Sequence, residues 1–287
     1  MTMNEINTNY KDYDPDTLKH LQTVIMDIFK DFIKICEEND IQYFLHAGTN
    51  IGAVRHKGFI PWDDEIDVAL LRDDYEKLLK ILDNENEKYY ISNLKKRFDV
   101  DDDVYTPKTL LCLKNTKLKQ KEHECTLYNF GIYIDINVLD EIPENKIKKF
   151  LFIKTVYFVK FLIFLTNSIQ CDEYTSKINE FIGHRLKFLF KIFNVPNFSL
   201  KIFTRLIKRY QGKSDIVCSP GEGVYIERTF HKSCFDQALI VQFEDIDAKI
   251  PVGYDEILKT FYGNYMEIPP LSERFNHNWK IIDFGEY

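Results

Sequence analysis

The chain has 287 residues, of which 45% are hydrophobic, 29% charged and 15% aromatic. This composition is sufficient to bury a large core, so it excludes a wholly disordered protein. Glycine and proline number 11 and 9, too few for a fibrous or low-complexity chain. No repeat with a period of about 20–50 residues is visible, and we therefore do not expect a solenoid or a propeller.

The N-terminal residues are polar and acidic, without the basic and apolar regions of a signal peptide. Six cysteines are scattered along the chain, and no two are spaced as C-x-x-C, which argues against a zinc ribbon or a thioredoxin motif. We therefore expect reduced thiols in a cytoplasmic protein. The cysteines should be small core or surface residues.

The net charge of −7 is unevenly distributed. Residues 146–213 hold 14 lysines and arginines against 3 acidic residues, whereas the rest of the chain holds 24 against 42. A basic segment in an acidic protein indicates an anionic partner, and lipid head groups or a phosphorylated substrate are the two candidates. The negative net charge and the lack of a matching motif make nucleic acid an unexpected partner.

Helix and strand periodicities alternate along the first third of the chain. Residues 16–38 predict an amphipathic helix, because apolar side chains recur at steps of three and four, with Asp14 or Asp16 as the cap. The apolar residues 41–45 predict a short buried strand. A short helical stretch, a basic loop and an acidic strand should follow, the loop at residues 55–58 and the strand at 65–71.

The later elements are more hydrophobic or more basic. Residues 147–169 form the most hydrophobic stretch, but Lys154 and Lys160 interrupt it, so a core or interfacial helix fits better than a transmembrane span. The remaining expected elements are a helix at 73–82, strands at 109–114 and 128–137, basic helices at 177–210, and short strands within 223–270 around a helix at 255–261.

Four acidic residues within five positions form the strongest chemical signal. If they lie in a strand, Asp63, Glu65 and Asp67 share one face, while Asp64 points to the other. Carboxylates packed on one face need a cation, and oxygen ligands favour Mg²⁺ or Mn²⁺ over zinc. Asp135, on a later apolar strand, would add a metal ligand or a general base. Since Mg²⁺ is usually shared with substrate phosphates, the pattern favours a nucleotide substrate.

Groups suited to phosphate binding precede the acidic cluster. Gly48 and Thr49 offer a backbone that a phosphate can approach closely, a hydroxyl, and a nearby helix N-terminus. Arg55, His56 and Lys57 supply cationic donors for phosphate oxygens. Each feature alone is also typical of an ordinary turn or a solvated loop. Their order and spacing together are much more specific.

Taken together, G-T-x-x-G-A-V-R-H-x-G-F-I-P-W-D-D-E-I-D-V at residues 48–68 resembles the LicD family of the nucleotidyltransferase-fold superfamily, which includes the fukutin-related enzymes. Glu65 stands where Asp is commoner and keeps the charge, and Ala47 replaces a glycine or serine. Further matching residues are Ile134-Asp135-Ile136, Asp140, Pro251, Tyr254, Tyr262-Gly263 and Pro269-Pro270.

The resemblance implies an α+β fold with a nucleotidyltransferase-like mixed β-sheet core flanked by helices and a helical basic insertion. It divides the chain into four parts. We expect a flexible N-terminus at 1–15, a catalytic core at 16–145, a basic helical subdomain at 146–213, and a C-terminal part at 214–287 that completes the single catalytic unit.

The family's activity implies a phosphotransferase. Such an enzyme moves a phosphorylated alcohol, such as phosphocholine from CDP-choline, from a CDP-activated donor to a sugar hydroxyl and releases CMP. The acceptor would be a cell-surface glycan of a capsule, a teichoic acid or a lipopolysaccharide. The implied catalytic residues are Glu65, Asp67 and Asp135, with Asp63 added to the metal ligands; the implied substrate-binding residues are Gly48, Thr49, Arg55, His56, Lys57 and Asp64.

Two other functions remain open at this stage. One is a nucleotidyltransferase that adds a nucleotide to a small molecule, and the other is a non-catalytic nucleotide-binding protein. The basic segment also has two interpretations. Residues 147–213 either form a helical subdomain packed on the core or dock on an anionic membrane, at the inner face of the plasma membrane, where a lipid-linked acceptor would lie.

Overall fold

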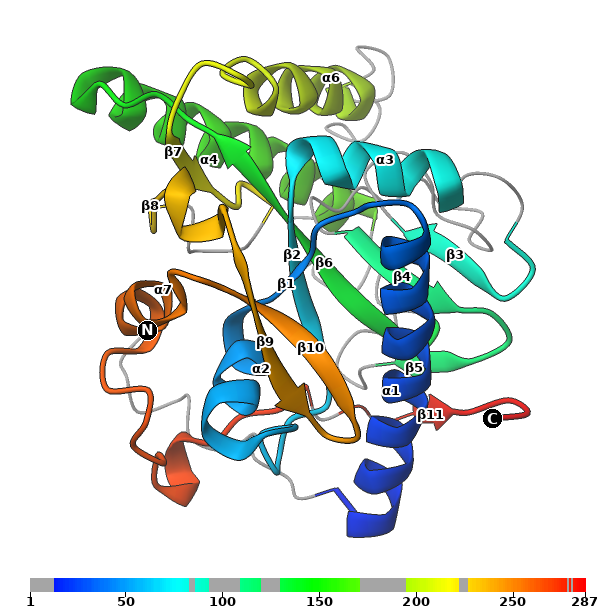
Figure 1. The fold of residues 1–287 in the computed structure, drawn as a ribbon. Coiled ribbons are helices and arrows are strands. Elements are labelled where there is room, and N and C mark those ends of the chain that lie inside the picture. The colour runs from blue at the N-terminus through cyan, green and yellow to red at the C-terminus, as the bar shows by residue number, and fades with distance from the viewer. Residues whose placement is uncertain are drawn as a thin grey trace.

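Helices cover a central mixed β-sheet (Figure 1). This computed structural model describes residues 13–82, 86–92, 109–119, 130–170, 195–221, 227–277, 279 and 281–287. The α+β class with a mixed sheet, expected from the sequence, is confirmed.

The described elements follow one another in an irregular order of helices and strands. The helical segments are α1 (Pro15–Glu38), α2 (Ala47–Ile51), the π-helix η2 (Gly52–His56), α3 (Arg72–Leu82), α4 (Lys146–Gln170), α6 (Val195–Ile207), η5 (Lys232–Phe235), α7 (Tyr254–Tyr262) and η6 (Leu271–Glu273). The strands are β1 (Phe44–Leu45), β2 (Asp67–Leu71), β3 (Tyr89–Ser92), β4 (Thr109–Leu113), β5 (Lys117–Lys119), β6 (Tyr133–Glu141), β7 (Ile216–Cys218), β8 (Phe230–His231), β9 (Ala238–Phe243), β10 (Ile246–Pro251) and β11 (Ile281–Asp283).

The main sheet has the order β1-β2-β6-β4-β3, and β7 pairs with both β6 and β8. Strands β2 and β6 run parallel, whereas the other described pairs of this sheet are antiparallel. A parallel pair requires a crossover connection, and here α3, β3, β4 and β5 lie between the two strands in the chain. Strand β6 therefore lies at the centre of the sheet with three partners.

Helix α1 supplies one side of the main core. Asp14 is its cap, because the side chain accepts hydrogen bonds from the backbone N–H and the hydroxyl of Thr17 at 3.1 and 3.0 Å. Apolar side chains at helical spacing, from Leu21 to Phe32, are fully buried in a cluster shared with the strands of the main sheet. The amphipathic pattern seen in the sequence is thus the face that covers the sheet.

Several expected strand boundaries are wrong. The first strand covers only Phe44–Leu45, opposite Val68 and Ala69. The acidic strand starts at Asp67 rather than Glu65, because residues 60–63 form a turn closed by a hydrogen bond from the Asp63 N–H to the Ile60 carbonyl. The strand expected at 128–137 is Tyr133–Glu141, extended at its end by pairing with β7; residues 128–129 lie outside the described residues.

The basic segment contributes a second, smaller core. Helices α4 and α6 pack together, and β7 closes their apolar side. The buried side chains that they share are Ile142, Phe152, Ile153, Val156, Val159, Ile163, Phe203, Ile207 and Cys218. Much of the helical stretch expected at 177–210 lies outside the described residues, and α6 is its described part. No described helix combines the length and the apolar character needed to cross a membrane.

The described cysteines are core residues. Cys36, Cys112, Cys218 and Cys234 are buried. Burial raises the pKa of the Cys36 thiol to about 12, so this thiol stays protonated and packs as an apolar group. Cys125 and Cys171 lie outside the described residues.

A buried ion pair fastens the end of β6 to the start of α3. The Arg72 guanidinium donates two hydrogen bonds to Asp140, Nε to Oδ1 at 2.6 Å and an Nη to Oδ2 at 2.7 Å. Both residues are buried. Burial raises the pKa of Asp140 although Arg72 lowers it, so this carboxylate depends on its partner to remain charged.

Replacing Arg72 with methionine should therefore leave an uncompensated buried carboxylate. We expect Arg72→Met to lower the free energy of unfolding by about 3–5 kcal/mol. Urea denaturation followed by circular dichroism measures this. The control is Lys34→Met, which removes a solvent-exposed pair with Glu38 and should change the free energy by less than about 1 kcal/mol. Equal effects of the two variants would contradict the role assigned to the buried pair.

Candidate active site

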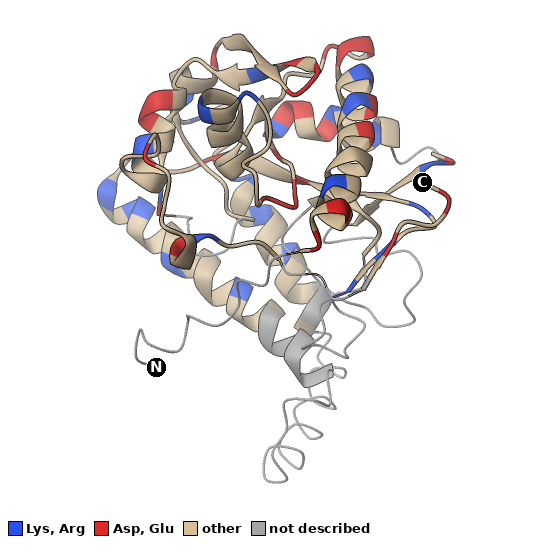
Figure 2. Cartoon of the chain, turned by 90° about the horizontal axis from the view of Figure 1, so that it is seen from below, with Lys and Arg blue, Asp and Glu red and all other residues tan. Residues whose placement is uncertain are grey.

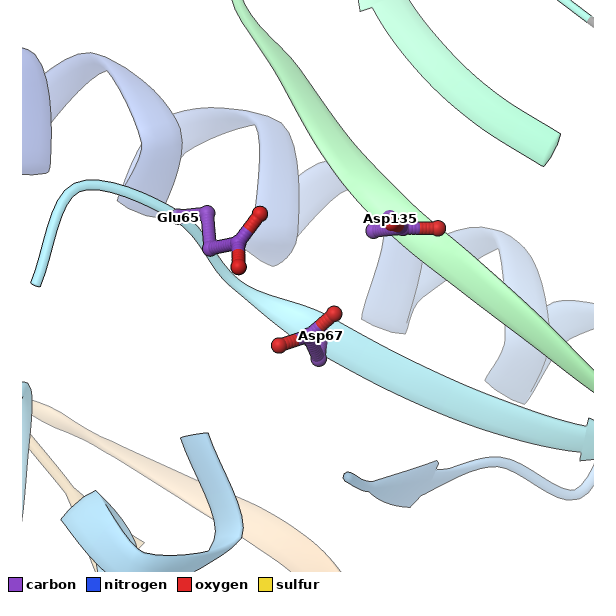
Figure 3. A group of neighbouring side chains, drawn as sticks. All are labelled: Glu65, Asp67 and Asp135. Atoms are coloured by element: carbon purple, nitrogen blue, oxygen red, sulfur yellow. The ribbon is translucent and has the colours of Figure 1, made fainter. Parts of the chain in front are cut away.

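Three carboxylates meet where β2 and β6 run side by side (Figure 3). Asp67 and Asp135 are register partners in this parallel pair, so their side chains lie on the same face of the sheet. Glu65 comes from the segment that leads into β2. Each of the three residues offers an oxygen within 4.8 Å of the others. This spacing and this set of hard oxygen ligands suit a divalent cation such as Mg²⁺ or Mn²⁺.

Hydrogen bonds fix the two strand carboxylates in place. The backbone N–H of Asp67 donates to the Thr49 hydroxyl at 2.8 Å, and the side-chain amide of Asn137 donates to Asp67 Oδ1 at 3.3 Å. The backbone N–H of Asp135 donates to the Ile66 carbonyl at 2.9 Å. Asp135 is 1% exposed and Asp67 8% exposed, so both carboxylates are held in a largely dry environment.

The cluster opens into a cavity of about 1120 Å³. One wall comes from α2, η2 and the segment before β2, including Gly48, Arg55 and Trp62. A second wall is formed by the chain from Tyr262 to Phe275, which follows α7. Segments more than 200 residues apart in the sequence thus enclose one space, and its floor carries the three carboxylates.

The cavity is strongly acidic. Its lining includes six carboxylates, and Arg55 is the single lysine, arginine or histidine among the described lining residues. Burial and the charges of Glu65 and Asp64 raise the pKa of Asp63 well above its usual value. Burial followed by the nearby carboxylates also raises the pKa of Tyr133, so its phenol stays neutral. A polyanionic substrate would be repelled here unless a cation were bound with it.

Gly48 and Asp63 lie together at the edge of the cluster. Both line the cavity, and a Cβ on Gly48 would stand 3.2 Å from Asp63 Oδ2. Asp63 is not a member of the three-residue cluster, so its expected role as a metal ligand remains a prediction. Thr49 is buried, and its hydroxyl accepts the Asp67 N–H. This contact gives Thr49 a part in positioning the cluster, distinct from the phosphate contact expected for it.

The three basic residues have different surroundings. Arg55 lines the cavity, and its Nη1 donates to the backbone carbonyls of Tyr265 and Glu267 at 2.5 and 2.9 Å. Its Nε donates to His56 Nε2 at 2.9 Å. His56 and Lys57 do not line the cavity, and the expected loop at Arg55 and His56 is a π-helix. Arg55 therefore joins the two walls, whereas the other two residues stand behind it.

Asp64 faces away from the cavity, as expected from strand alternation. Its carboxylate is nevertheless buried and hydrogen-bonded rather than exposed to solvent. It is 2% exposed and accepts hydrogen bonds from the Tyr13 hydroxyl at 2.6 Å and from His277, through the backbone N–H at 3.1 Å and Nδ1 at 3.0 Å. The Trp279 N–H donates to the same Tyr13 hydroxyl at 2.8 Å. Asp64 thus ties both ends of the described chain to the site, and the structure shows no cavity contact for its expected substrate-binding role.

Several residues that the structure brings to the site were not predicted from the sequence. Asn137 follows Asp135 by two positions, so strand alternation alone would have placed it on the same face. The wall at 262–275 coincides with the Tyr-Gly and Pro-Pro pattern, which matched the family but was given no place in the site. His277 Nε2 is 3.5 Å from Glu65 Oε2, and no spacing pattern in the sequence signals this contact.

The comparisons with known proteins agree with this geometry. Residues 40–138 match the family described as "LicD/FKTN/FKRP, nucleotidyltransferase domain". The chain carries a LicD-family nucleotidyltransferase domain. The matched segment contains all three carboxylates, α2, η2 and β2, and most of β6.

The similarity to one curated relative extends well beyond the LicD-family domain. The chain is 28% identical over 271 residues to the "Lipopolysaccharide cholinephosphotransferase LicD" of Haemophilus influenzae, covering 91% of this chain and 96% of that protein. An uncharacterized protein of Rickettsia prowazekii is 27% identical over 113 residues, which cover 37% of this chain and 42% of that protein.

The carboxylate cluster predicts an unusual effect of neutral substitutions. We expect Asp135→Asn to leave the metal-free protein as stable as the wild type or more stable, because it removes repulsion among three close carboxylates. The same variant should lose most of the increase in melting temperature that Mn²⁺ gives the wild type. Thermal unfolding with and without Mn²⁺ measures both effects.

The matched control for Asp135→Asn is Asp247→Asn, an exposed carboxylate on β10. It should leave both the stability and the Mn²⁺ response unchanged. A wild-type protein that shows no response to Mn²⁺ or Mg²⁺ would contradict the metal assignment.

The Asp64 contacts predict a structural effect away from the cavity. Asp64→Ala leaves the partly buried donors of Tyr13 and His277 without their acceptor and should lower the free energy of unfolding by about 2–4 kcal/mol. Limited proteolysis should then cut the C-terminal segment faster than in the wild type. Unchanged stability and cleavage would show that Asp64 does not hold these segments.

Proposed function

We propose that the protein transfers phosphocholine from CDP-choline to a sugar hydroxyl of a cell-surface glycan and releases CMP. The observation that carries this proposal is the cluster of Glu65, Asp67 and Asp135 on the floor of an acidic cavity. The near full-length similarity to a protein described as a lipopolysaccharide cholinephosphotransferase supports the choice of phosphocholine and of a glycan acceptor.

The carboxylate cluster fits a divalent metal ion by its chemistry. Three oxygen ligands within 4.8 Å suit Mg²⁺ or Mn²⁺, which commonly bind one or more carboxylates together with substrate phosphates. Glu65 and Asp67 would hold the ion, with Asp135 as a third ligand or as the base. When bound, the metal would neutralise negative charge on the pyrophosphate of the donor.

In the proposed reaction, the acceptor hydroxyl oxygen attacks the phosphorus atom that carries choline. The bond from that phosphorus to the bridging oxygen breaks, and CMP leaves with the electron pair. The hydroxyl proton passes to a carboxylate of the cluster, for which Asp135 is our candidate. Arg55, at the junction of the two walls, contributes positive charge beside the leaving CMP.

The composition of the cavity favours a cationic alcohol. Choline carries a permanent positive charge, and Glu267 and Glu273 face the cavity beyond the metal-binding cluster. Aromatic side chains accompany them, including Trp62, whose ring already carries the Arg274 guanidinium at 4.3 Å from its centroid. Acidic and aromatic groups together bind quaternary ammonium better than they bind a neutral polyol such as ribitol or glycerol.

The proposal includes the location expected from the sequence, which is the cytoplasm. A cytoplasmic enzyme acting on a lipid-linked acceptor would work at the inner face of the plasma membrane. A nucleotidyltransferase acting on a small molecule, or a nucleotide-binding protein without activity, would share the cluster. These alternatives differ in which part of the donor is found on the product.

The decisive test is product analysis with purified protein, CDP-choline, Mg²⁺ and a lipopolysaccharide or sugar acceptor. We expect CMP release and an acceptor that gains phosphocholine, detected by mass spectrometry. Asp67→Asn should lower kcat by at least about a hundredfold because it weakens the metal site while leaving the strand intact. Asp247→Asn should retain full activity.

Three results would contradict the proposed transfer of phosphocholine. Transfer of the nucleotide to the acceptor would indicate a nucleotidyltransferase. Donor binding without turnover over a panel of glycans would favour a binding protein. Faster reaction with CDP-ribitol or CDP-glycerol than with CDP-choline would overturn the argument from the acidic and aromatic walls.

A further inference from the structure

Helix α4 exposes large apolar side chains on the surface that faces solvent. We name this surface the α4 stripe. Its members have 54–72% of their surface exposed and are Ile147, Phe150, Leu151, Phe158 and Phe161. Exposed apolar residues scattered singly are ordinary, but five on one helix need an explanation.

The helical spacing places these five side chains on one face. At about 100° per residue, they fall within an arc of roughly 100°. The buried side chains of α4, among them Phe152, Val156 and Val159, lie on the opposite face and pack against α6 and β7. The helix is therefore apolar on two faces, and only one of them is used by the fold.

Lysines accompany the stripe. Helix α4 contains five lysines and no acidic residue (Figure 2). Lys149 donates to Thr229, and Lys160 to the carbonyls of Pro220 and Gly221, so these two have internal contacts. Lys146, Lys148 and Lys154 are exposed, and Lys154 Nζ lies 5.5 Å from the Phe150 ring centroid within the stripe.

The position of the first three lysines is unfavourable for the helix itself. Lys146, Lys148 and Lys149 occupy the first turn, which contains no acidic residue. The helix dipole places partial positive charge there, so basic side chains in this turn destabilise the helix rather than stabilise it. An anionic partner at this end of α4 would account for the exposed Lys146 and Lys148 in a chain of net charge −7.

We propose that the α4 stripe docks the protein on an anionic lipid bilayer. The aromatic and aliphatic side chains enter the interface between head groups and acyl chains, while the exposed lysines contact lipid phosphates. A second copy of the chain is a poorer partner for this face. In a symmetric dimer the same basic stripe would meet itself, and like charges would oppose each other.

The arrangement of the fold leaves the active-site cavity accessible in this docked state. Asp135 lies near the start of β6, and α4 follows the end of the same strand. Figure 1 accordingly shows α4 and α2 toward opposite ends of the molecule. Docking through α4 would therefore hold the enzyme at the surface without covering the carboxylate cluster.

Flotation with lipid vesicles tests the proposal without any measurement of transfer. We expect the wild-type protein to float with vesicles of phosphatidylcholine and phosphatidylglycerol at a ratio of about 7:3, and to stay unbound with pure phosphatidylcholine. Binding should weaken as NaCl is raised, because salt screens the lysines from the surface charge. Because the readout is binding alone, its failure is separable from failure of the proposed activity.

Two variants of the stripe distinguish its charges from its apolar side chains. We expect each to lower the vesicle partition coefficient at least tenfold, since each basic residue near an anionic surface contributes about fivefold. The variants are Lys146→Gln/Lys148→Gln/Lys154→Gln and Phe150→Gln/Phe158→Gln/Phe161→Gln.

Each variant has a control that makes the same kind of change at exposed positions elsewhere. The controls should bind vesicles as the wild type does, and circular dichroism should show that all four variants are folded. The controls are Lys19→Gln/Lys34→Gln/Lys80→Gln and Leu239→Gln/Ile240→Gln/Val252→Gln.

Three outcomes would overturn the proposal. The first is no binding of the wild type to anionic vesicles. The second is binding that the stripe variants leave unchanged. The third is a wild-type dimer in sedimentation experiments that the apolar variant converts to a monomer, since the stripe would then be an interface between two copies.

Discussion

The parallel pairing of β2 and β6 is the constraint on which the site depends. Its register sets Asp67 opposite Asp135 on one face of the sheet, and the segment that leads into β2 adds Glu65. Such a concentration of like charge opposes folding of the metal-free protein. An extensive apolar core offsets this opposition, together with two hydrogen bonds at Asp67. Its backbone N–H donates to the Thr49 hydroxyl, and its carboxylate accepts from the Asn137 side-chain amide.

The same charge explains how one cavity suits both ends of the proposed donor. Phosphate groups are excluded from an acidic cavity unless a divalent cation enters with them, and the cluster supplies the ligands for one. A cationic alcohol needs no divalent cation to enter, because the carboxylates of Glu267 and Glu273 attract it directly. Arg55 supplies positive charge to the same cavity. Its hydrogen bonds to the Tyr265 and Glu267 carbonyls join the wall at 262–275 to η2.

The family resemblance was enough to predict the α+β class, and local patterns in the sequence predicted the helices at α1, α3 and α4 and the three carboxylates that meet. They failed where the outcome depends on distant segments. The strand was expected to begin at Glu65, but a turn at Ile60–Asp63 precedes it and the strand begins at Asp67. The buried contacts of Asp64 require residues from both ends of the described chain, and no local periodicity specifies them.

The central claim is that Glu65, Asp67 and Asp135 together hold a divalent metal ion. Crystals grown with Mn²⁺ and CDP-choline, measured at a wavelength where manganese scatters anomalously, test it most directly. The account predicts an anomalous peak within coordination distance of all three carboxylates and of the donor phosphates. A peak bound elsewhere, or well-ordered donor in this cavity with no peak beside the cluster, would contradict it.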